Sequence, residues 1–306
     1  TINLYAYASI EPTDDSTISI ESIDRKISVS YPSGEALIHD GNLDLIKEVY
    51  NKVVKKFTHK PLSFKLSTFL DAPAGSGLGA SSTLVVAVLG AFTEWLKLPL
   101  GEYDIAHLAY EIERVDLKMA GGRQDQYSAT FGGVNFMEFY KDDKVIVNPL
   151  KIKEQYLEEL AHNLILYYTE TSRYSSSIIE TQMQNVLNKN LQSIEASHHL
   201  KEQAEMMKEV LLRGDVNEVG RILDFGWQNK KQLTQGITNP LLDEIYATAI
   251  ENGASGGKIS GAGGGGFMVF YCPDNKRYKV LESLTKFGGY EKKYSFTKEG
   301  LTSWTI

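Results

Sequence analysis

One short stretch limits what this chain of 306 residues can fold into. Residues 61–92 read PLSFKLSTFLDAPAGSGLGASSTLVVAVLGAF. The alternation of apolar and polar residues in 61–70 predicts a strand, and the apolar spacing of 81–97 predicts a helix. A glycine-rich turn between them places several backbone N–H groups at a helix N-terminus, where unsatisfied donors and the helix dipole favour an anion. The stretch therefore predicts an anion site, and phosphate is the usual ligand.

Three kinds of phosphate loop compete for this stretch. The P-loop needs a lysine directly after its last glycine, and none follows Gly79, so that pattern fails. The dinucleotide fingerprint is formally met by Gly75, Gly77 and Ala80, but it also requires an acidic residue closing a strand about 20 residues on. The sequence there is LKLPLGEYD, which begins another helix, so this second interpretation is weak.

The third interpretation depends on two serines where the helix begins. The hydroxyl of Ser81 or Ser82 is in a position to reach a metal ion held between phosphates, while backbone amides hold the phosphates themselves. A serine at this place is equally common as a simple helix N-cap. The two serines alone leave both alternatives open.

The arrangement Pro73-x-x-x-Gly77-Leu78-Gly79-x-Ser81 resembles the central motif of the galactokinase, homoserine kinase, mevalonate kinase and phosphomevalonate kinase superfamily, the GHMP kinases. The superfamily motif reads Pro-x-x-x-Gly-Leu-Gly-Ser-Ser-Ala, and this chain has Ala80 and Ser82 in place of a serine and an alanine. The resemblance implies that Ser81 binds Mg²⁺, with Ser82 as the substitute if the register shifts. It also implies an ATP-binding loop made of Pro73, Gly75, Ser76, Gly77, Leu78, Gly79, Ala80, Ser81 and Ser82.

A kinase of this kind needs a carboxylate for the metal and usually a base for the attacking hydroxyl. At 100° per residue, Glu113 falls on the edge of a buried helical stripe, whereas Glu111 points nearly opposite. Asp125 lies in GGRQDQ, which we predict to be a polar turn. Taken alone, Glu113 also fits a partly buried ion pair and Asp125 also fits ordinary turn chemistry.

The resemblance extends over this second segment. In the superfamily the metal-binding glutamate precedes a glycine-containing turn by about a dozen residues, and an aspartate in that turn is the base. The resemblance therefore implies that Glu113 is a metal ligand and that Asp125 is the catalytic base. The string GGRQDQYSATFGG looks like the branch of kinases acting on D-glycero-D-manno-heptose 7-phosphate, and also like fucokinase domains.

A third glycine-rich segment, KISGAGGGGFMVFYC, precedes a buried strand and has five glycines within 261–266. So many glycines exceed the needs of a tight turn and allow close backbone approach to a ligand or another loop. The segment resembles the C-terminal motif of the superfamily, beside the nucleotide loop and the substrate. It implies substrate contacts from Gly261, Gly263 and Gly264.

A sugar phosphate requires a cationic partner for its own phosphate. Arg173 is the first candidate, because it follows a predicted strand and has Ser and Thr hydroxyls around it, and Arg123 is the second. Each arginine also fits an ordinary surface or ion-pair role. In heptose kinases a Thr–Arg–Ser-rich stretch occurs at a similar place, so Thr171 and Arg173 carry this resemblance better than Arg123.

The pattern of elements predicts an α+β protein of two domains, residues 1–154 and 155–306. The resemblance implies a ribosomal-protein-like first domain, with the ATP loop and the carboxylates, and a ferredoxin-like second domain. The superfamily opens with a strand and a glycine-rich loop that contributes to the sugar site. We expect this segment upstream of Thr1; the alternative is that this chain lacks that part of the substrate site. Expected helices are 43–56, 81–97, 101–117, much of 175–252 and 276–287; expected strands lie within 1–31 and at 61–70, 134–140, 144–150, 162–169, 267–272 and 290–297.

Composition narrows the functional class. The net charge of −7 disfavours a sequence-independent nucleic-acid surface, and no apolar run reaches the length of a membrane span. Cys272 is the single cysteine, which excludes an internal disulfide and favours a reducing compartment, so we expect a soluble cytoplasmic protein without a nucleic-acid or membrane partner. A homodimer remains open.

The resemblance implies an ATP- and Mg²⁺-dependent sugar kinase. Its expected reaction is phosphorylation of D-glycero-D-manno-heptose 7-phosphate at the anomeric hydroxyl, which gives heptose 1,7-bisphosphate for nucleotide-heptose and surface polysaccharide synthesis. A fucokinase-like or other free-sugar kinase is the enzymatic alternative. A nucleic-acid-binding module and a catalytically inactive nucleotide-binding regulator are the alternatives from other classes.

Overall fold

The structure is a computed structural model, and it describes all residues except 74 and 172–174. Its contacts divide the chain into two compact units. The first comprises Thr1–Ala74, Gly79–Gly133 and Thr297–Ile306, and the second comprises Gly75–Leu78 and Val134–Phe296. Residues 75–78, 134–154 and 297–306 belong to a different unit from the domain expected for them. The expected domain boundary between residues 154 and 155 stays a prediction.

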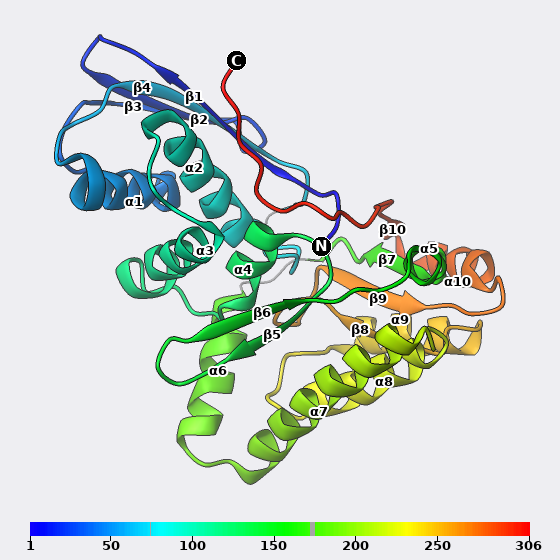
Figure 1. Ribbon diagram of the computed structural model, residues 1–306. Coiled ribbons are helices and arrows are strands. Elements are labelled where there is room, and N and C mark those ends of the chain that lie inside the picture. Colours follow the sequence, from blue (N-terminus) through cyan, green and yellow to red (C-terminus); the bar gives the residue numbers. More distant parts are fainter. Residues whose placement is uncertain (74, 172–174) are drawn as a thin grey trace. The chain divides into compact units, whose positions relative to one another are not determined.

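The first unit is built on a four-stranded sheet of order β1-β4-β2-β3, in which β2 and β4 are parallel and the other pairs antiparallel. Helices α1 and α2 cover one face of this sheet (Figure 1). Alternation explains the arrangement, because Ile18, Ile20, Phe64 and Leu66 are buried under the helices. The strands are β1 (Ala6–Pro12), β2 (Thr17–Ser22), β3 (Ile27–Pro32) and β4 (Phe64–Leu70).

The helices of this unit include two segments of wider π-helical turns, which continue α1 and α3 without a break. The second of them, Glu111–Asp116, carries Glu113 and replaces the end of the α-helix expected over 101–117. The elements are α1 (Asp44–Val53), η1 (Val54–Thr58), α2 (Ala80–Leu96), α3 (Glu102–Tyr110), η2 (Glu111–Asp116) and α4 (Gln124–Phe131).

Helix α4 corrects one sequence-based expectation. Asp125 was expected in a turn, but it lies in the first turn of α4. The helix is stabilised by contacts that are distant in sequence, since Tyr127 and Phe131 pack on Tyr103 of α3. The side chain of Gln126 is fully buried.

The second unit has an antiparallel four-stranded sheet of order β10-β7-β9-β8 and a separate β5–β6 hairpin. One face of the larger sheet packs on α9, α10 and Trp227 of α8, while Tyr271 and Leu160 belong to a second core cluster with α7 and α8. The strands are β5 (Asn135–Phe139), β6 (Val145–Pro149), β7 (Leu164–Tyr168), β8 (Gly256–Ile259), β9 (Phe267–Tyr271) and β10 (Tyr290–Glu291).

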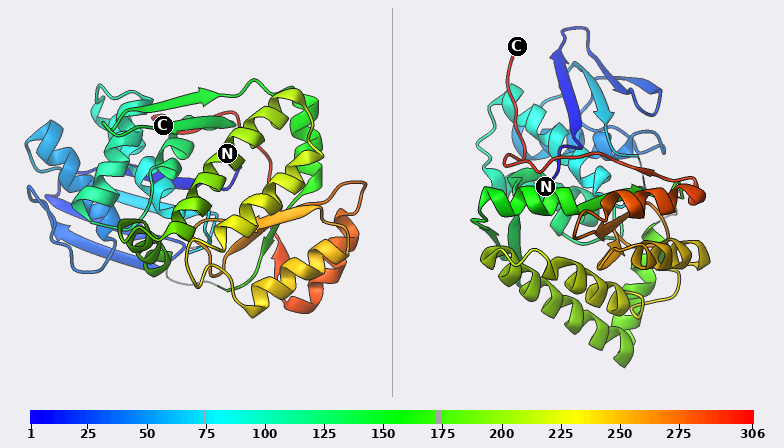
Figure 2. Two further views of the ribbon diagram at one scale, coloured as in Figure 1. Left: turned by 90° about the horizontal axis from the view of Figure 1, so that it is seen from below. Right: turned by 90° about the vertical axis from the view of Figure 1, so that its right-hand side faces the viewer.

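Helices α7 and α8 of this unit lie side by side (Figures 1 and 2). The sequence analysis did not predict helix α5, which ends directly before β7, and it did not predict strand β8. It also predicted a strand over 290–297, of which only Tyr290 and Glu291 pair with β7. The helices are α5 (Glu154–Asn163), α6 (Ser175–Leu187), α7 (Leu191–Arg213), α8 (Glu218–Lys230), α9 (Pro240–Glu251), α10 (Arg277–Leu284) and η3 (Thr285–Phe287). In the described parts of the chain, every helix is too short or too polar to cross a membrane.

Candidate active site

The loop between β4 and α2 requires glycine at three alternate positions. Gly75, Gly77 and Gly79 have φ values of 73°, 81° and 71°, in the left-handed region that side chains with a Cβ atom rarely adopt. Ser76, between the first two, is buried, and its hydroxyl has no hydrogen-bond partner among the described residues. Pro73 and Leu78 are half-buried, and Ala80 is the first residue of α2.

The two serines do not cap the helix. The N-cap of α2 is Gly79, which makes no side-chain hydrogen bond, so the first turn keeps N–H groups available for an anion. The Ser81 hydroxyl donates to Glu113 Oε1 at 2.5 Å, and the Ser82 hydroxyl donates to Glu113 Oε2 at 2.6 Å. Of the two alternatives left open by the sequence, the N-cap is thus wrong.

Glu113 is completely buried and lies in the π-helical segment η2. Besides the two serines, the amide of Gln126 donates to Glu113 Oε2, and the guanidinium of Arg114 lies 3.8 Å from the same oxygen. A buried carboxylate is costly unless it is hydrogen-bonded or paired, and these contacts meet that need. Single turns of π-helix are frequent at functional sites, because they reposition one side chain within a helix.

The donor set around Glu113 fits Mg²⁺. A carboxylate and two hydroxyls are hard oxygen ligands, and Mg²⁺ is usually bound by one or two carboxylates together with substrate phosphates and water. Within the described ranges, no group of three or more His, Cys, Asp or Glu side chains is arranged to hold a metal ion. A metal at Glu113 would therefore take most of its ligands from a bound nucleotide.

Asp125 lies beside the glycine loop. A Cβ atom added to Gly79 would be 3.0 Å from both Cβ and Cγ of Asp125. Burial raises the pKa of the Asp125 carboxyl, the charge of Glu113 raises this pKa further, and a hydrogen bond with Gln124 and the charge of Arg114 oppose the shift. Perturbed carboxyl pKa values of this kind are concentrated at functional sites.

In the second unit, the two glycine-rich segments pack backbone to backbone. A Cβ atom on Gly77 would lie 2.7 Å from the carbonyl oxygen of Ser260, and one on Gly261 would lie 2.7 Å from Cα of Gly77. Phe267 N donates to the carbonyl oxygen of Ser76 at 3.0 Å. The expected close approach of the C-terminal segment to another loop is thus present, and it requires glycine on both sides.

The proposed substrate residues have different surroundings. The carbonyl oxygen of Thr171 accepts from Gly266 N at 2.6 Å, while Gly264 N donates to the carbonyl oxygen of Ile237, against which Gly263 also packs. Arg123 lies over the ring of Tyr110, with 4.4 Å from its guanidinium carbon to the ring centroid. Arg173 lies outside the described residues.

The sequence missed two lysines beside the C-terminal glycine segment. The ammonium group of Lys230 donates to the carbonyl oxygen of Gly261. Burial lowers the pKa of Lys230 to about 7, with the charge of Lys258 acting in the same direction, and burial also lowers the pKa of Lys258. Lys258 stands three residues before Gly261, but nothing in the sequence sets Lys230 apart from other lysines that end helices.

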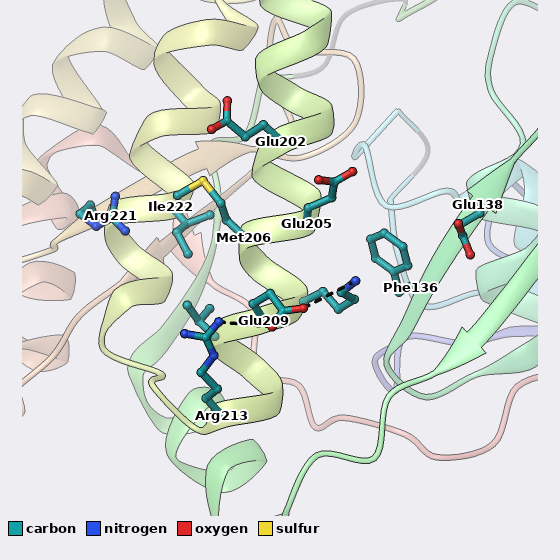
Figure 3. A pocket seen from close by; sticks show the side chains of 11 residues that line it. Phe136, Glu138, Glu202, Glu205, Met206, Glu209, Arg213, Arg221 and Ile222 are labelled. Atoms are coloured by element: carbon teal, nitrogen blue, oxygen red, sulfur yellow. Dashed lines mark hydrogen bonds and ion pairs between the residues drawn. The ribbon is translucent and has the colours of Figure 1, made fainter.

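A cavity of about 570 Å³ in the second unit lies between the β5–β6 hairpin and helices α7 and α8. Figure 3 shows Phe136 and Glu138 on the hairpin side and Glu205 and Glu209 on the side of α7. None of the residues predicted for the site lines this cavity. This cavity is therefore separate from the predicted site residues.

Two family models match the chain, the GHMP kinases N-terminal domain over residues 44–133 and the GHMP kinases C-terminal domain over residues 207–289. The chain belongs to the GHMP kinases and is a phosphotransferase, so the nucleic-acid-binding module is not retained.

The family includes proteins with high similarity over the whole chain. D-glycero-alpha-D-manno-heptose 7-phosphate kinase of Campylobacter jejuni is 49% identical over 306 residues, 100% of this chain and 90% of that protein. The crystal structure of a putative sugar kinase from Campylobacter jejuni is 48% identical with a TM-score of 0.83, covering 100% of this chain and 88% of that one. A D-glycero-D-manno-heptose 1-phosphate kinase from Bacteroides thetaiotaomicron is 43% identical, with the same TM-score and coverage.

Proposed function

We propose that this kinase transfers the γ-phosphoryl group of ATP to the anomeric hydroxyl of D-glycero-D-manno-heptose 7-phosphate. The product would be heptose 1,7-bisphosphate, a precursor for nucleotide-activated heptose and surface polysaccharide. The observation that carries the choice of substrate is the full-length similarity to the Campylobacter jejuni heptose 7-phosphate kinase. We also propose a cytoplasmic location, which the buried free thiol of Cys272 supports.

The loop from Gly75 to Ser82 would hold the triphosphate of ATP. Its support is the uncapped first turn of α2 and the buried hydroxyl of Ser76, which has no partner among the described residues. Buried polar groups are nearly always hydrogen-bonded, so an orphaned hydroxyl in a glycine loop is suited to a phosphate oxygen. Backbone N–H groups and this hydroxyl would bind and orient the phosphates.

Ser81 and Glu113 would hold Mg²⁺. When bound, the ion supplies positive charge that neutralises the phosphates and polarises the phosphorus being attacked. In the structure, the Ser81 hydroxyl and the Glu113 carboxylate already share a hydrogen bond, so these two ligands lie within reach of one small cation. Ser82 and Gln126 would keep the Glu113 carboxylate in its orientation.

Asp125 would act as the base. Its carboxylate would accept the proton of the anomeric hydroxyl while that oxygen forms a bond to the γ-phosphorus of ATP and the bond to the bridging oxygen breaks, releasing ADP. The raised pKa of Asp125 brings its basicity closer to that needed near neutral pH. The contact with Gly79 sets its carboxylate against the phosphate loop.

Thr171, Gly261, Gly263 and Gly264 would line the sugar site, together with Arg123 and Arg173. The packing of Thr171 against Gly265 and Gly266 supports the first group. Arg123 is the weaker of the two arginines, because its guanidinium is already stacked on Tyr110 and bonds the Tyr110 hydroxyl at 3.3 Å.

A coupled ADP-release assay tests this function. The enzyme would receive ATP, Mg²⁺ and one sugar at a time: heptose 7-phosphate, heptose 1-phosphate, mannose 6-phosphate, fucose or galactose. We expect the highest kcat/KM with heptose 7-phosphate and a loss of about 100-fold or more in kcat for Asp125→Asn. Asp116→Asn, on the exposed end of η2, is the control and should keep full activity.

Other outcomes of the panel would change the proposal in defined ways. Turnover restricted to fucose or galactose would contradict the phosphorylated substrate and retain a free-sugar kinase. Preference for heptose 1-phosphate would move the attacking hydroxyl away from the anomeric carbon, in line with the name of the Bacteroides relative. Undiminished activity of Asp125→Asn would remove Asp125 from the chemical step.

A further inference from the structure

Lys230 and Lys258 stand together at the start of the C-terminal glycine segment. Lys230 is the last residue of α8, and its ammonium group donates to the carbonyl oxygen of Gly261. Lys258 lies in β8, three residues before the same glycine. Both side chains are half-buried, so solvent still reaches part of each.

Close packing of α8 on β8 fixes the position of the two lysines relative to each other (Figure 1). A Cβ atom on Gly256 would lie 1.8 Å from the carbonyl oxygen of Gly220, and one on Gly220 would lie 1.9 Å from the Ser255 hydroxyl. At Gly220 and Gly256 the helix therefore approaches the strand closely enough to leave no room for a Cβ atom. Such packing gives the pair a rigid base, as a binding site requires.

The charges of these two lysines are not balanced. Across the residues that the structure describes, neither lysine forms an ion pair, and the charge of Lys258 acts on Lys230 with the same sign. The carboxylate of Asp224, also on α8, is engaged by the Tyr246 hydroxyl at 2.6 Å and the Gln228 amide at 2.8 Å. Partial burial of two like charges without a counterion is unfavourable, and a bound anion would relieve it.

We propose that Lys230 and Lys258 bind a phosphate group of one of the two substrates, beside the Gly261–Gly266 segment. The inference rests on the proposed function, because it assigns residues to the phosphates which that reaction requires. The phosphate belongs either to the sugar phosphate or to ATP, and both present the same chemistry. Lysine suits this role as a compact cation with three donors.

The test uses Lys230→Met and Lys258→Met, which keep an apolar stem and remove the charge. Lys201→Met, from an exposed position on α7, is the control for the loss of one positive charge. KM would be measured for heptose 7-phosphate at saturating ATP and for ATP at saturating sugar phosphate, with thermal unfolding of every variant. We expect at least a tenfold rise in one KM, equal to about 1.4 kcal/mol of binding, and no change in the control.

The pattern of KM values identifies the source of the phosphate. A rise for heptose 7-phosphate alone assigns the pair to the sugar phosphate, and a rise for ATP alone assigns it to the nucleotide. If both KM values stay within twofold of wild type in both folded variants, the pair has only the structural role of holding Gly261, and the inference is overturned.

Binding of inorganic phosphate to the wild-type enzyme provides a second readout, which requires neither variant nor turnover. Calorimetry near pH 8 in two buffers of different ionisation enthalpy should detect proton uptake, because a bound anion returns the proton that burial removes from Lys230. Phosphate binding without proton uptake would overturn the role of Lys230. If the wild-type enzyme rejects heptose 7-phosphate but binds phosphate with proton uptake, the proposed function fails and the anion site stands.

Discussion

Replacing Gly79 by alanine tests whether Asp125 acts at the phosphate loop. Gly79 has φ 71° and ψ 23°, a left-handed conformation that costs about 1–2 kcal/mol for a residue with a Cβ atom. The new Cβ would also lie 3.0 Å from Cβ and Cγ of Asp125, whereas carbon atoms in contact are normally about 3.5–4.0 Å apart. Relief requires Asp125 or the loop to move by roughly 0.5–1 Å.

A shift of this size should lower kcat by about tenfold to 100-fold, since a misplacement of about 1 Å can cost ~100-fold in rate. Gly41→Ala is the matched control, because Gly41 has φ 90° and nothing within 4 Å of the added methyl group. Both variants carry the left-handed strain, and Gly79→Ala adds the contact with Asp125, so its thermal unfolding should change by at least as much, while only Gly79→Ala should lose kcat in the ADP-release assay. Equal kcat in the two variants would refute the placement of Asp125 beside the reacting groups.

Three further predictions concern the metal, the nucleotide and pH. Glu113→Gln should raise the Mg²⁺ concentration for half-maximal activity by about tenfold or more, since it removes the negative charge of the proposed carboxylate ligand, and Glu111→Gln should not; equal Mg²⁺ titrations would contradict the ligand assignment. Gly77→Ala should weaken ATP binding in calorimetry, because its Cβ would lie 2.7 Å from the Ser260 carbonyl oxygen, and unchanged affinity would show that the loop does not hold ATP. If the lysine pair binds the sugar phosphate, the kcat/KM for heptose 7-phosphate should fall as pH rises through about 7, where Lys230 loses its proton while the sugar phosphate is already dianionic. Lys258 is the charged neighbour that lowers the pKa of Lys230. If the Lys230→Met variant kept the pH profile of the wild-type enzyme, Lys230 would not be the cause of this fall.

The parts of the site that are close in sequence could be predicted from it. Alternation before Leu70 and helical spacing after Ala80 predicted the strand and the helix, and the glycines between them predicted the turn. Helical periodicity placed Glu113 on the edge of the buried stripe, and its side chain is fully buried, although the segment is π-helical rather than α-helical.

The other parts depend on contacts between residues far apart in sequence. The polar residues around Asp125 follow two glycines, a pattern typical of a turn. Tyr127, however, packs on Tyr103 of α3, and the Gln126 amide donates a hydrogen bond to Glu113. These tertiary contacts stabilise a helix there. Lys230 is an ordinary lysine at a helix end, and only the packing of α8 on β8 brings it to Gly261.

Phosphorus NMR of the sugar product tests the central claim most directly. After complete reaction of heptose 7-phosphate with ATP, the account predicts two phosphomonoester resonances on the sugar, one of them coupled to the anomeric proton. A second phosphate without that coupling would contradict transfer to the anomeric hydroxyl. Release of ADP and inorganic phosphate with the sugar unchanged would contradict the sugar kinase itself.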